Sequence, residues 1–350
     1  MLRSALLGIG LGLLALGGVA SEAQAQSKLI GSGASFPFPL YATWFQSYSA
    51  ATDGVTIDYQ AKGSGAGIND LINGVVDFAA SDAAMSDEEA AKVEAGVVML
   101  PMTAGEIVLA FNIPGVDELR LPRDVYPAIF AGEITRWNDE RIVAANPDVE
   151  MPDMNITVVT RSDSSGTTFV FSKHLAAVSD LFHDADDEGT PAGAIVSGKT
   201  VEWPAIPTFV AAPKNDGITA MVTQTPGSIG YIEYGYAKLT NTPSAMLENS
   251  SGNFIAAGDA AGMSALASAE FEGDDLRVWV TDPANPDAYP IATFTWMLFY
   301  ENQDDGKAEI LRNFVEWAVT DGQAMASELG YIPLPDVVVE KVRAAAADIR

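Results

Sequence analysis

The sequence predicts an α/β protein whose sheet is at least partly parallel. Three stretches share one order: a short apolar strand, a loop rich in glycine and hydroxyl side chains, and a helix with apolar residues at i, i+3, i+4 and i+7. Strands that alternate with helices in this way are typical of βαβ units. The length of 350 residues and the 48% hydrophobic content allow a sizeable core and, by length alone, two domains.

The first two units fill much of the N-terminal third of the chain. KLIGSGASFPFP leads into the first predicted helix, and the strand VTIDYQ is followed by the loop AKGSGAG and a second helix. Each helix carries one apolar stripe, which predicts packing of that face on the sheet. The stripes are Tyr41, Trp44, Phe45 and Tyr48 in the first helix, and Ile68, Leu71, Ile72 and Val75 in the second.

Another helix start follows in VVDFAASDAAMSDEEAAKV. Ser86 and Glu89 are three residues apart and form a capping box that opens this helix, so Asp82 lies in the loop just before it. Residues 105–113, GEIVLAFNI, are nearly all apolar and predict a buried strand that ends at Pro114-Gly115.

The third strand–loop–helix unit begins at residue 155. NITVVTR predicts a strand, DSSG a tight loop, and the residues after it a helix with the stripe Phe171, Leu175, Val178 and Phe182. Polar connectors surround this unit, and one of them, DPANPDAYP, precedes a further apolar run at residues 291–300, IATFTWMLFY.

The N-terminus has the features of a cleaved secretory signal peptide, predicted at residues 1–25. Arg3 precedes an apolar run, and Ala23-Gln24-Ala25 resembles a cleavage site, which places the cut near Ala25. A membrane anchor is the alternative, but it needs about 20 apolar residues, and this run is shorter and diluted by glycine. The prediction is an exported protein in a bacterial periplasm, with secretion beyond it left open.

Charge and composition exclude several classes of protein. A formal net charge of -28 argues against binding of nucleic acid or of anionic membrane surfaces, because neither would gain counterion-release energy from this surface. The chain has no cysteine, which excludes a disulfide framework, a thiol nucleophile and a lipid-bearing N-terminal cysteine.

The stretch GAIVSGKT, residues 193–200, fits the phosphate-binding P-loop pattern letter for letter. Its context is wrong, because a P-loop follows a buried strand and opens a helix. Here the stretch follows HDADDEGTPA and runs into TVEWPAIP, where Pro204 and Pro207 oppose a helix. Dinucleotide binding is also excluded, since GSGASF and GSGAGI lack the third glycine of that motif.

A serine hydrolase would need a base beside Ser164 or Ser165, and the only histidines are His174 and His183. On one helix, Ser165 and His174 are nine positions apart at about 100° each, which puts them on opposite faces. The alternative is two surface histidines on an ordinary helix. With two histidines and no cysteine, the sequence predicts no transition-metal site.

Hydroxyl groups and free main-chain N–H groups recur at the starts of the three helices. The first turn of a helix has unpaired amides and a positive dipole end, so such a place binds an oxyanion. Ordinary N-capping by serine or threonine would explain any one of these loops. Three loops, one of them with Arg161, favour a single shared anion site.

These residues resemble the periplasmic phosphate-binding proteins of bacterial ABC phosphate importers, the PstS family. The resemblance covers nearly all of the predicted mature chain. It rests on GSGASFPFPLYATW, DYQAKGSGAGI, VDFAASDAAMSD, AFNIPG, RSDSSGTTFVF, NDGITA and PGSIGYIEYGYA, spaced in family order.

The resemblance implies a two-lobed periplasmic binding protein of type II, with mixed, mainly parallel sheets and one dehydrated phosphate in the cleft between the lobes. It implies neither an enzyme nor a cofactor. Ser35 keeps a hydroxyl where some relatives carry threonine, and KGSGAG replaces a double-serine form, which puts a hydroxyl contact beside Ser64 in doubt. The implied phosphate contacts are Ser35, Phe36, Ser64, Asp82, Arg161, Asp163, Ser165, Gly166 and Thr167.

In that arrangement Arg161 supplies the positive charge and Asp163 holds it in position. Asp82 would accept the proton that phosphate still carries near neutral pH, although capping of the adjacent helix is the alternative. The resemblance also implies lobe one at residues 26–109 and 291–350 and lobe two at residues 110–290, with crossings near Ala110 and Ile291.

The implied partners are inorganic phosphate, with arsenate left open, and the permease subunits of an ABC transporter in the inner membrane. The protein is expected to be a monomer. Two alternatives stay open on the same scaffold. A phosphatase-like enzyme would release product from a phosphomonoester, and a phosphate-sensing or adhesion protein would not stimulate a permease.

Overall fold

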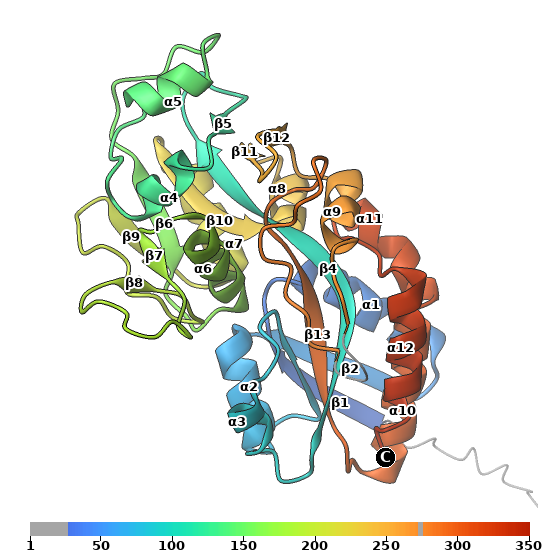
Figure 1. Ribbon diagram of the computed structural model, residues 1–350. Coiled ribbons are helices and arrows are strands. Elements are labelled where there is room, and N and C mark those ends of the chain that lie inside the picture. Colours follow the sequence, from blue (N-terminus) through green and yellow to red (C-terminus); the bar gives the residue numbers. More distant parts are fainter. Residues whose placement is uncertain (1–26, 272–275) are drawn as a thin grey trace, which may run out of the picture.

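The computed structural model describes residues 27–271 and 276–350, so the predicted signal peptide and its cleavage site lie outside the described residues. Figure 1 shows two groups of helices and strands joined along the long strand β4, Val97–Asn112. Eight strands form one mixed sheet in the order β2-β1-β3-β13-β4-β10-β6-β9. Within the described ranges, no helix combines the length and the apolar character needed to cross a bilayer.

The first group contains the two predicted N-terminal units. β1 pairs in parallel with both β2 and β3, as βα units require. α1 buries all four residues of its predicted stripe: Tyr41 and Phe45 meet Tyr59 of β2, Tyr48 meets Phe314 of α10 (Asp305–Ala318), and the indole N–H of Trp44 donates to the carbonyl of Gly322 at 2.8 Å. The elements are β1 (Ser27–Gly33), α1 (Phe38–Ala51), β2 (Val55–Ala61), α2 (Ser64–Ile72), β3 (Phe78–Ser81) and α3 (Asp87–Ala90).

Strand β4 belongs to both groups. Its first part pairs antiparallel with β13, Ala292–Tyr300, up to the pair Glu106 and Ala292. Its second part pairs antiparallel with β10, Ser228–Glu233, beginning at Ile107. β4 therefore changes its partner between two consecutive residues. Both β4 and β13 are almost entirely buried at that point.

The second group is built from the third predicted unit and the strands beside it. β6 pairs in parallel with β10 on one side and with β9 on the other. Helix α6 follows β6, and α7 follows β9, so both helices begin at the same edge of the sheet. The elements are β6 (Thr157–Arg161), α6 (Gly166–Val178), β9 (Phe209–Ala212) and α7 (Lys214–Gln224).

Shorter elements complete both groups. The C-terminal helices α10 and α12 pack together on the first group, on the side of α1, where Phe45 meets Phe314 with ring centroids 5.3 Å apart (Figure 1). The remaining elements are β5 (Arg120–Leu121), α4 (Val125–Phe130), α5 (Glu140–Ala145), β7 (Phe182–His183), β8 (Ile195–Val196), α8 (Tyr234–Thr240), β11 (Met246–Glu248), β12 (Phe254–Ile255), α9 (Asp259–Leu266), α10 (Asp305–Ala318), η1 (Asp321–Met325), α11 (Ala326–Leu329) and α12 (Asp336–Ala346).

Three details of the predicted pattern are wrong. Val75 is 61% exposed rather than part of the α2 stripe, because the helix ends at Ile72 and Gly74 turns the chain at φ +67°. Phe182 lies in β7, beyond the end of α6. The strand predicted at residues 105–113 begins at Val97, because its first half pairs with β13.

Gly67 allows α2 to approach β1 closely, and we expect its replacement to destabilise the protein. A Cβ atom at Gly67 would lie 2.4 Å from the Cα of Gly33 and 2.9 Å from the carbonyl of Ser32. We expect Gly67→Ala to lower the free energy of unfolding by about 1–3 kcal/mol, the usual cost of overpacking.

The matched control is Gly306→Ala in α10, where the nearest atom to the new Cβ is 3.5 Å away. Since alanine favours a helix over glycine, this change should stabilise the protein by up to about 1 kcal/mol. Chemical denaturation of both variants measures the difference. Equal effects would show that Gly67 is not needed for close packing.

Candidate functional site

The predicted site residues lie at or just after the carboxyl ends of parallel strands in both groups of elements. Ser35, Ser64 and Asp82 come just after β1, β2 and β3, and Arg161 is the last residue of β6. Parallel strands bring their carboxyl ends to one edge of a sheet, and in open α/β sheets ligands bind outside that edge. The fold therefore brings the side chains of the two groups together at their facing edges.

Asp82 is the centre of this cluster. It is 1% exposed, and its Oδ1 accepts a hydrogen bond of 2.9 Å from Thr295 Oγ1. Its Oδ2 accepts longer hydrogen bonds from Thr167 Oγ1 at 3.4 Å and from Ser64 Oγ at 3.5 Å. Burial raises the pKa of Asp82 to about 7, although Thr295 and the charge of Arg161 partly oppose the rise.

The capping alternative for Asp82 is wrong. Helix α3 has the predicted capping box, in which Ser86 Oγ accepts from the N–H of Glu89 and the Glu89 carboxylate accepts from the N–H of Ser86. The carboxylate of Asp82 points instead toward Ser64, Thr167 and Thr295.

Arg161 is held rigidly beside this carboxylate. Its side chain is 2% exposed, and Nε and Nη2 donate to the two oxygens of Asp163 at 2.8 and 2.5 Å. Nη1 donates to Thr167 Oγ1 at 3.3 Å. Burial alone would raise the pKa of Asp163, but the hydrogen bonds and charge of Arg161 outweigh it and lower that pKa. Asp163 therefore stays ionised, and within the described ranges two of the five N–H bonds of Arg161 remain for another acceptor.

The start of α6 contacts the start of α2 directly. Ser165 caps α6 by accepting from the N–H of Thr168 at 3.0 Å. A Cβ atom at Gly166 would lie 2.5 Å from Ser64 Oγ and 2.7 Å from Asp82 Oδ2, so only glycine fits there. The free amides at the first turn of α6 therefore lie close to the hydroxyl of Ser64 and the carboxylate of Asp82.

Ser35 and Phe36 reach this place from the loop before α1. Ser35 Oγ is buried and accepts from the main-chain N–H of Asn215 at 3.1 Å and from its Nδ2 at 3.0 Å. The ring of Phe36 packs into the core, edge-on to Tyr331 with centroids 6.4 Å apart. The main chain of Phe36, rather than its ring, is therefore the part that can contribute hydrogen bonds at the site.

Two residues of the cluster were not predicted from the sequence. Asn215 bridges Ser35 and Thr167, and Thr295 binds Asp82 from β13. Asn215 lies in NDGITA, one of the stretches that carry the family resemblance. Thr295 is a polar residue within an otherwise apolar strand, which is itself a sign of a required hydrogen-bond partner.

The hydrolase interpretation finds no support. His174 is buried rather than on the surface, and its Nε2 lies 2.8 Å from the hydroxyl of Tyr126. Burial lowers the pKa of His174 to about 3, so the ring is neutral. The P-loop context is also absent among the described residues, because β8 at residues 195–196 is not followed by a helix before α7.

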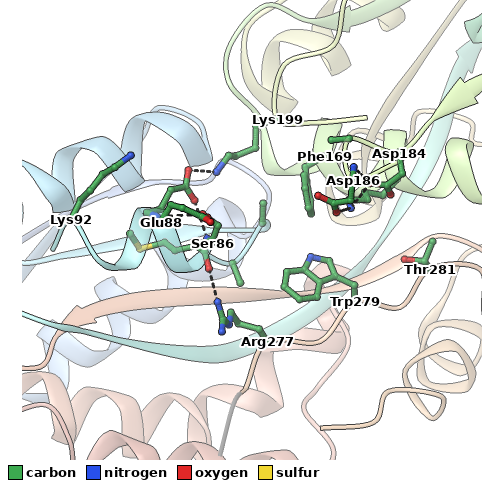
Figure 2. A pocket seen from close by; sticks show the side chains of 16 residues that line it. Ser86, Glu88, Lys92, Phe169, Asp184, Asp186, Lys199, Arg277, Trp279 and Thr281 are labelled. Atoms are coloured by element: carbon green, nitrogen blue, oxygen red, sulfur yellow. Dashed lines mark hydrogen bonds and ion pairs between the residues drawn. The ribbon is translucent and has the colours of Figure 1, made fainter. Parts of the chain in front are cut away.

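A cavity of about 650 Å³ opens beside the cluster, and the nine predicted residues do not line it. Figure 2 shows that its walls come from both groups, with Glu88 and Lys92 on one side, Phe169 and Asp186 on the other, and Trp279 below Phe169. Lys199 Nζ and Glu89 Oε1 form an ion pair of 2.5 Å across it. Because the carbonyl of Lys199 accepts from the N–H of Ser165 at 2.8 Å, this ion pair is linked to the start of α6.

Comparison with known proteins identifies the family. Residues 18–322 match the family model described as a PBP superfamily domain. The phosphate-binding protein PstS of Pasteurella multocida is 35% identical over 327 residues, which are 92% of this chain and 90% of that protein. The PstS of Methanocaldococcus jannaschii is 33% identical over 332 residues, 88% and 83% of the two chains.

The chain belongs to the PstS family. This confirms the predicted resemblance and the α/β periplasmic binding protein fold. The structure of a periplasmic phosphate-binding protein called PfluDING, bound with phosphate, has a TM-score of 0.69 at 22% identity and covers 91% of this chain and 93% of that one. The phosphate-binding protein of Stenotrophomonas maltophilia has a TM-score of 0.68 at 21% identity, with the same coverage. PstS proteins are solute-binding proteins, and at these identities the two structures show the shared fold.

The raised pKa of Asp82 can be measured directly. We expect the carboxyl ¹³C resonance of Asp82 in ligand-free protein to titrate near pH 7. Thr295→Val should move the midpoint upward, because Thr295 donates a hydrogen bond that stabilises the ionised form. Asp163 serves as the control, since its pKa is lowered and it should stay ionised over the same range. Titration of Asp82 near pH 4 would show that the carboxylate is hydrated.

Proposed function

We propose that this protein binds one inorganic phosphate ion in the cluster around Asp82 and delivers it to the permease subunits of an ABC phosphate importer. The observation that carries this proposal is the buried convergence of Arg161, the start of α6 and the hydroxyl of Ser64 around the Asp82 carboxylate, with Ser35 joined to Thr167 through Asn215. The names of the PstS relatives support it.

The side chains divide the work of binding a dehydrated dianion. Arg161 provides the only formal positive charge of the cluster and keeps two N–H bonds for the ligand. The amides of Gly166 and Thr167 and the hydroxyls of Ser35, Ser64, Ser165 and Thr167 provide neutral donors. Such donors are stronger in a buried site than in water, so they can replace the hydration shell of the ion.

The role of Asp82 is discrimination between anions. A carboxylate only accepts hydrogen bonds, so it suits an oxyanion that still carries a proton, as phosphate does near neutral pH and sulfate does not. Facing sulfate, two acceptors would meet with no proton between them.

Export and assembly follow the same proposal. We propose cleavage near Ala25, action in the periplasm as a monomer without a cofactor, and no catalytic activity. We also propose lobes at residues 26–109 with 291–350 and at 110–290. The carbonyl of Leu276 accepts from the Trp296 indole at 2.9 Å, which favours adding the stretch at 276–280 to the first lobe.

Isothermal titration calorimetry of phosphate-stripped protein tests the proposal. We expect one phosphate per chain at micromolar affinity or better, roughly -8 kcal/mol or stronger. Arsenate, sulfate and a phosphomonoester complete the series, and release of product from the ester would reveal a phosphatase. Absence of heat with phosphate would contradict the proposed function.

Arg161→Ala should lose more affinity for phosphate than Ser64→Ala. The arginine change removes a charge-assisted partner of the anion and leaves Asp163 without its cationic partner, so we expect a loss of about 2 kcal/mol or more. The serine change removes one neutral donor, with an expected loss of about 1 kcal/mol. Calorimetry of both variants measures the difference, and equal losses would mean that Arg161 is peripheral.

Asp82→Asn should weaken the rejection of sulfate while phosphate binding is largely kept. The amide can donate where the carboxylate cannot, and sites built around one hydrogen bond reject an analogue that lacks it by about 10⁴-fold. The measurement is the ratio of sulfate to phosphate affinity for both proteins at pH 8.

The pH dependence provides the control for that experiment. Since the pKa of Asp82 is raised to about 7, the neutral acid forms as the pH falls below 7 and can then donate to sulfate. Sulfate stays a dianion from pH 8 to pH 5, whereas phosphate gains a second proton, so the control measures the affinity for sulfate alone. Wild-type affinity for sulfate should therefore rise from pH 8 to pH 5, whereas that of Asp82→Asn should change little. A wild-type sulfate affinity that does not rise, together with a sulfate-to-phosphate ratio at pH 8 equal to that of the variant, would refute this role of Asp82.

A further inference from the structure

Asn215 connects three segments of the site from a fully buried position at the start of α7. Its Nδ2 donates to Ser35 Oγ at 3.0 Å and to Thr167 Oγ1 at 3.2 Å. Its Oδ1 accepts from the main-chain N–H of Glu233 at 2.9 Å. The loop before α1, the first turn of α6 and the end of β10 therefore meet on one amide side chain.

The orientation of this amide is determined by its surroundings. The main-chain N–H of Glu233 can only donate, so the oxygen of Asn215 must face it. The NH₂ group then has to face the two hydroxyls, and an amide can only donate from that end.

The hydroxyl of Ser35 can only donate to a further partner, because both of its lone pairs already accept hydrogen bonds. A hydroxyl has one proton and two lone pairs. Ser35 Oγ accepts from the Nδ2 of Asn215 and from the main-chain N–H of the same residue, neither of which can accept in return. In the described chain, no protein acceptor takes the proton of Ser35, so that proton is available to a ligand.

Thr167 is constrained in the same way. Its Oγ1 accepts from Arg161 Nη1 at 3.3 Å and from Asn215 Nδ2 at 3.2 Å. Its proton is left with a long hydrogen bond of 3.4 Å to Asp82 Oδ2. A closer anionic oxygen would take that proton.

We propose that Asn215 is a positioning residue that makes the hydroxyls of Ser35 and Thr167 obligatory donors to the bound anion. This inference rests on the proposed binding of phosphate. With both hydroxyls restricted to donating, neither can accept a proton of the ligand, whereas the carboxylate of Asp82 can. The chain thereby assigns unprotonated oxygens to the side of Ser35 and Thr167 and the protonated oxygen to the side of Asp82.

The backbone before Asn215 fits this role. Lys214 has φ +60°, a left-handed conformation that non-glycine residues rarely adopt. There the N–H of Lys214 donates to Asp163 Oδ1 at 2.8 Å and the next N–H donates to Ser35 Oγ. One strained turn thus supports both the partner of Arg161 and the hydroxyl of Ser35.

A double-mutant cycle between Asn215→Asp and Ser35→Ala tests the proposal, with inorganic phosphate titrated at pH 8. In the wild-type background, Ser35→Ala should weaken binding about tenfold, the loss of one buried hydrogen bond to an ion. In the Asn215→Asp background it should weaken binding less than about twofold, because the new carboxylate already accepts the Ser35 proton. Repulsion between that carboxylate and phosphate cancels in the cycle, since it acts equally on both members.

Asn249→Asp is the matched control. Asn249 is 1% exposed, and its Nδ2 donates to the carbonyls of Pro286 and Ala288, away from the cluster. In the Asn249→Asp background, Ser35→Ala should still weaken phosphate binding about tenfold. The proposal is overturned if Ser35→Ala weakens phosphate binding equally in the wild-type and Asn215→Asp backgrounds. Wild-type protein that does not bind phosphate would overturn the proposed function instead.

Neutron diffraction of the wild-type phosphate complex decides the question without any variant. The deuterons of Ser35 and Thr167 should point to phosphate oxygens, and both deuterons of the Asn215 amide should point to the two hydroxyls. A Ser35 deuteron directed at any protein atom would refute the proposal even if Asn215→Asp fails to fold.

Discussion

β4 pairs with a different strand in each half of the molecule, and this divided pairing sets how the two halves face each other. One continuous strand pairs with β13 up to Glu106 and with β10 from Ile107 onward. The register of these two ladders determines how the carboxyl ends of β1 and β3 face those of β6 and β9. Since the site residues lie at those ends, their separation depends on a backbone that passes through both halves of the molecule.

The acidic composition does not oppose an anion site in this arrangement. The formal charge of -28 counts every carboxyl group as ionised. Burial raises the pKa of Glu106 and Glu233 well above the usual range, which favours their neutral forms, and raises that of Asp82 to about 7, so that Asp82 is only partly ionised at neutral pH. Exposed carboxylates are screened over a Debye length of about 8 Å at physiological salt. The field in the cluster therefore comes mainly from Arg161, its partner Asp163 and the helix-start amides.

The sequence predicted the local parts of this molecule better than its long-range contacts. The capping box at Ser86 and the stripe of α1 are settled by residues within one or two turns, and the structure has both. Asn215 contacts Ser35 across 180 positions, and Thr295 contacts Asp82 across 213, so neither pair has a local pattern. His174 was misjudged for the same reason, because Tyr126, its partner, lies on another helix. For Val75, the spacing extended the predicted stripe three residues past Ile72, the last residue of α2 before the turn at Gly74.

The distinction between a helix cap and an anion ligand also depends on long-range contacts. Serine near a helix start usually caps it, and Ser165 does so. The N-cap residues of α1 and α2 are Pro37 and Gly63, which form no side-chain cap, so Ser35 and Ser64 are not used in this way. Their hydroxyls instead contact Asn215 and Asp82 on other strands and helices. A short sequence window shows that a hydroxyl is present, whereas only the tertiary fold determines whether its lone pairs are already occupied and hence whether its proton is free for a ligand.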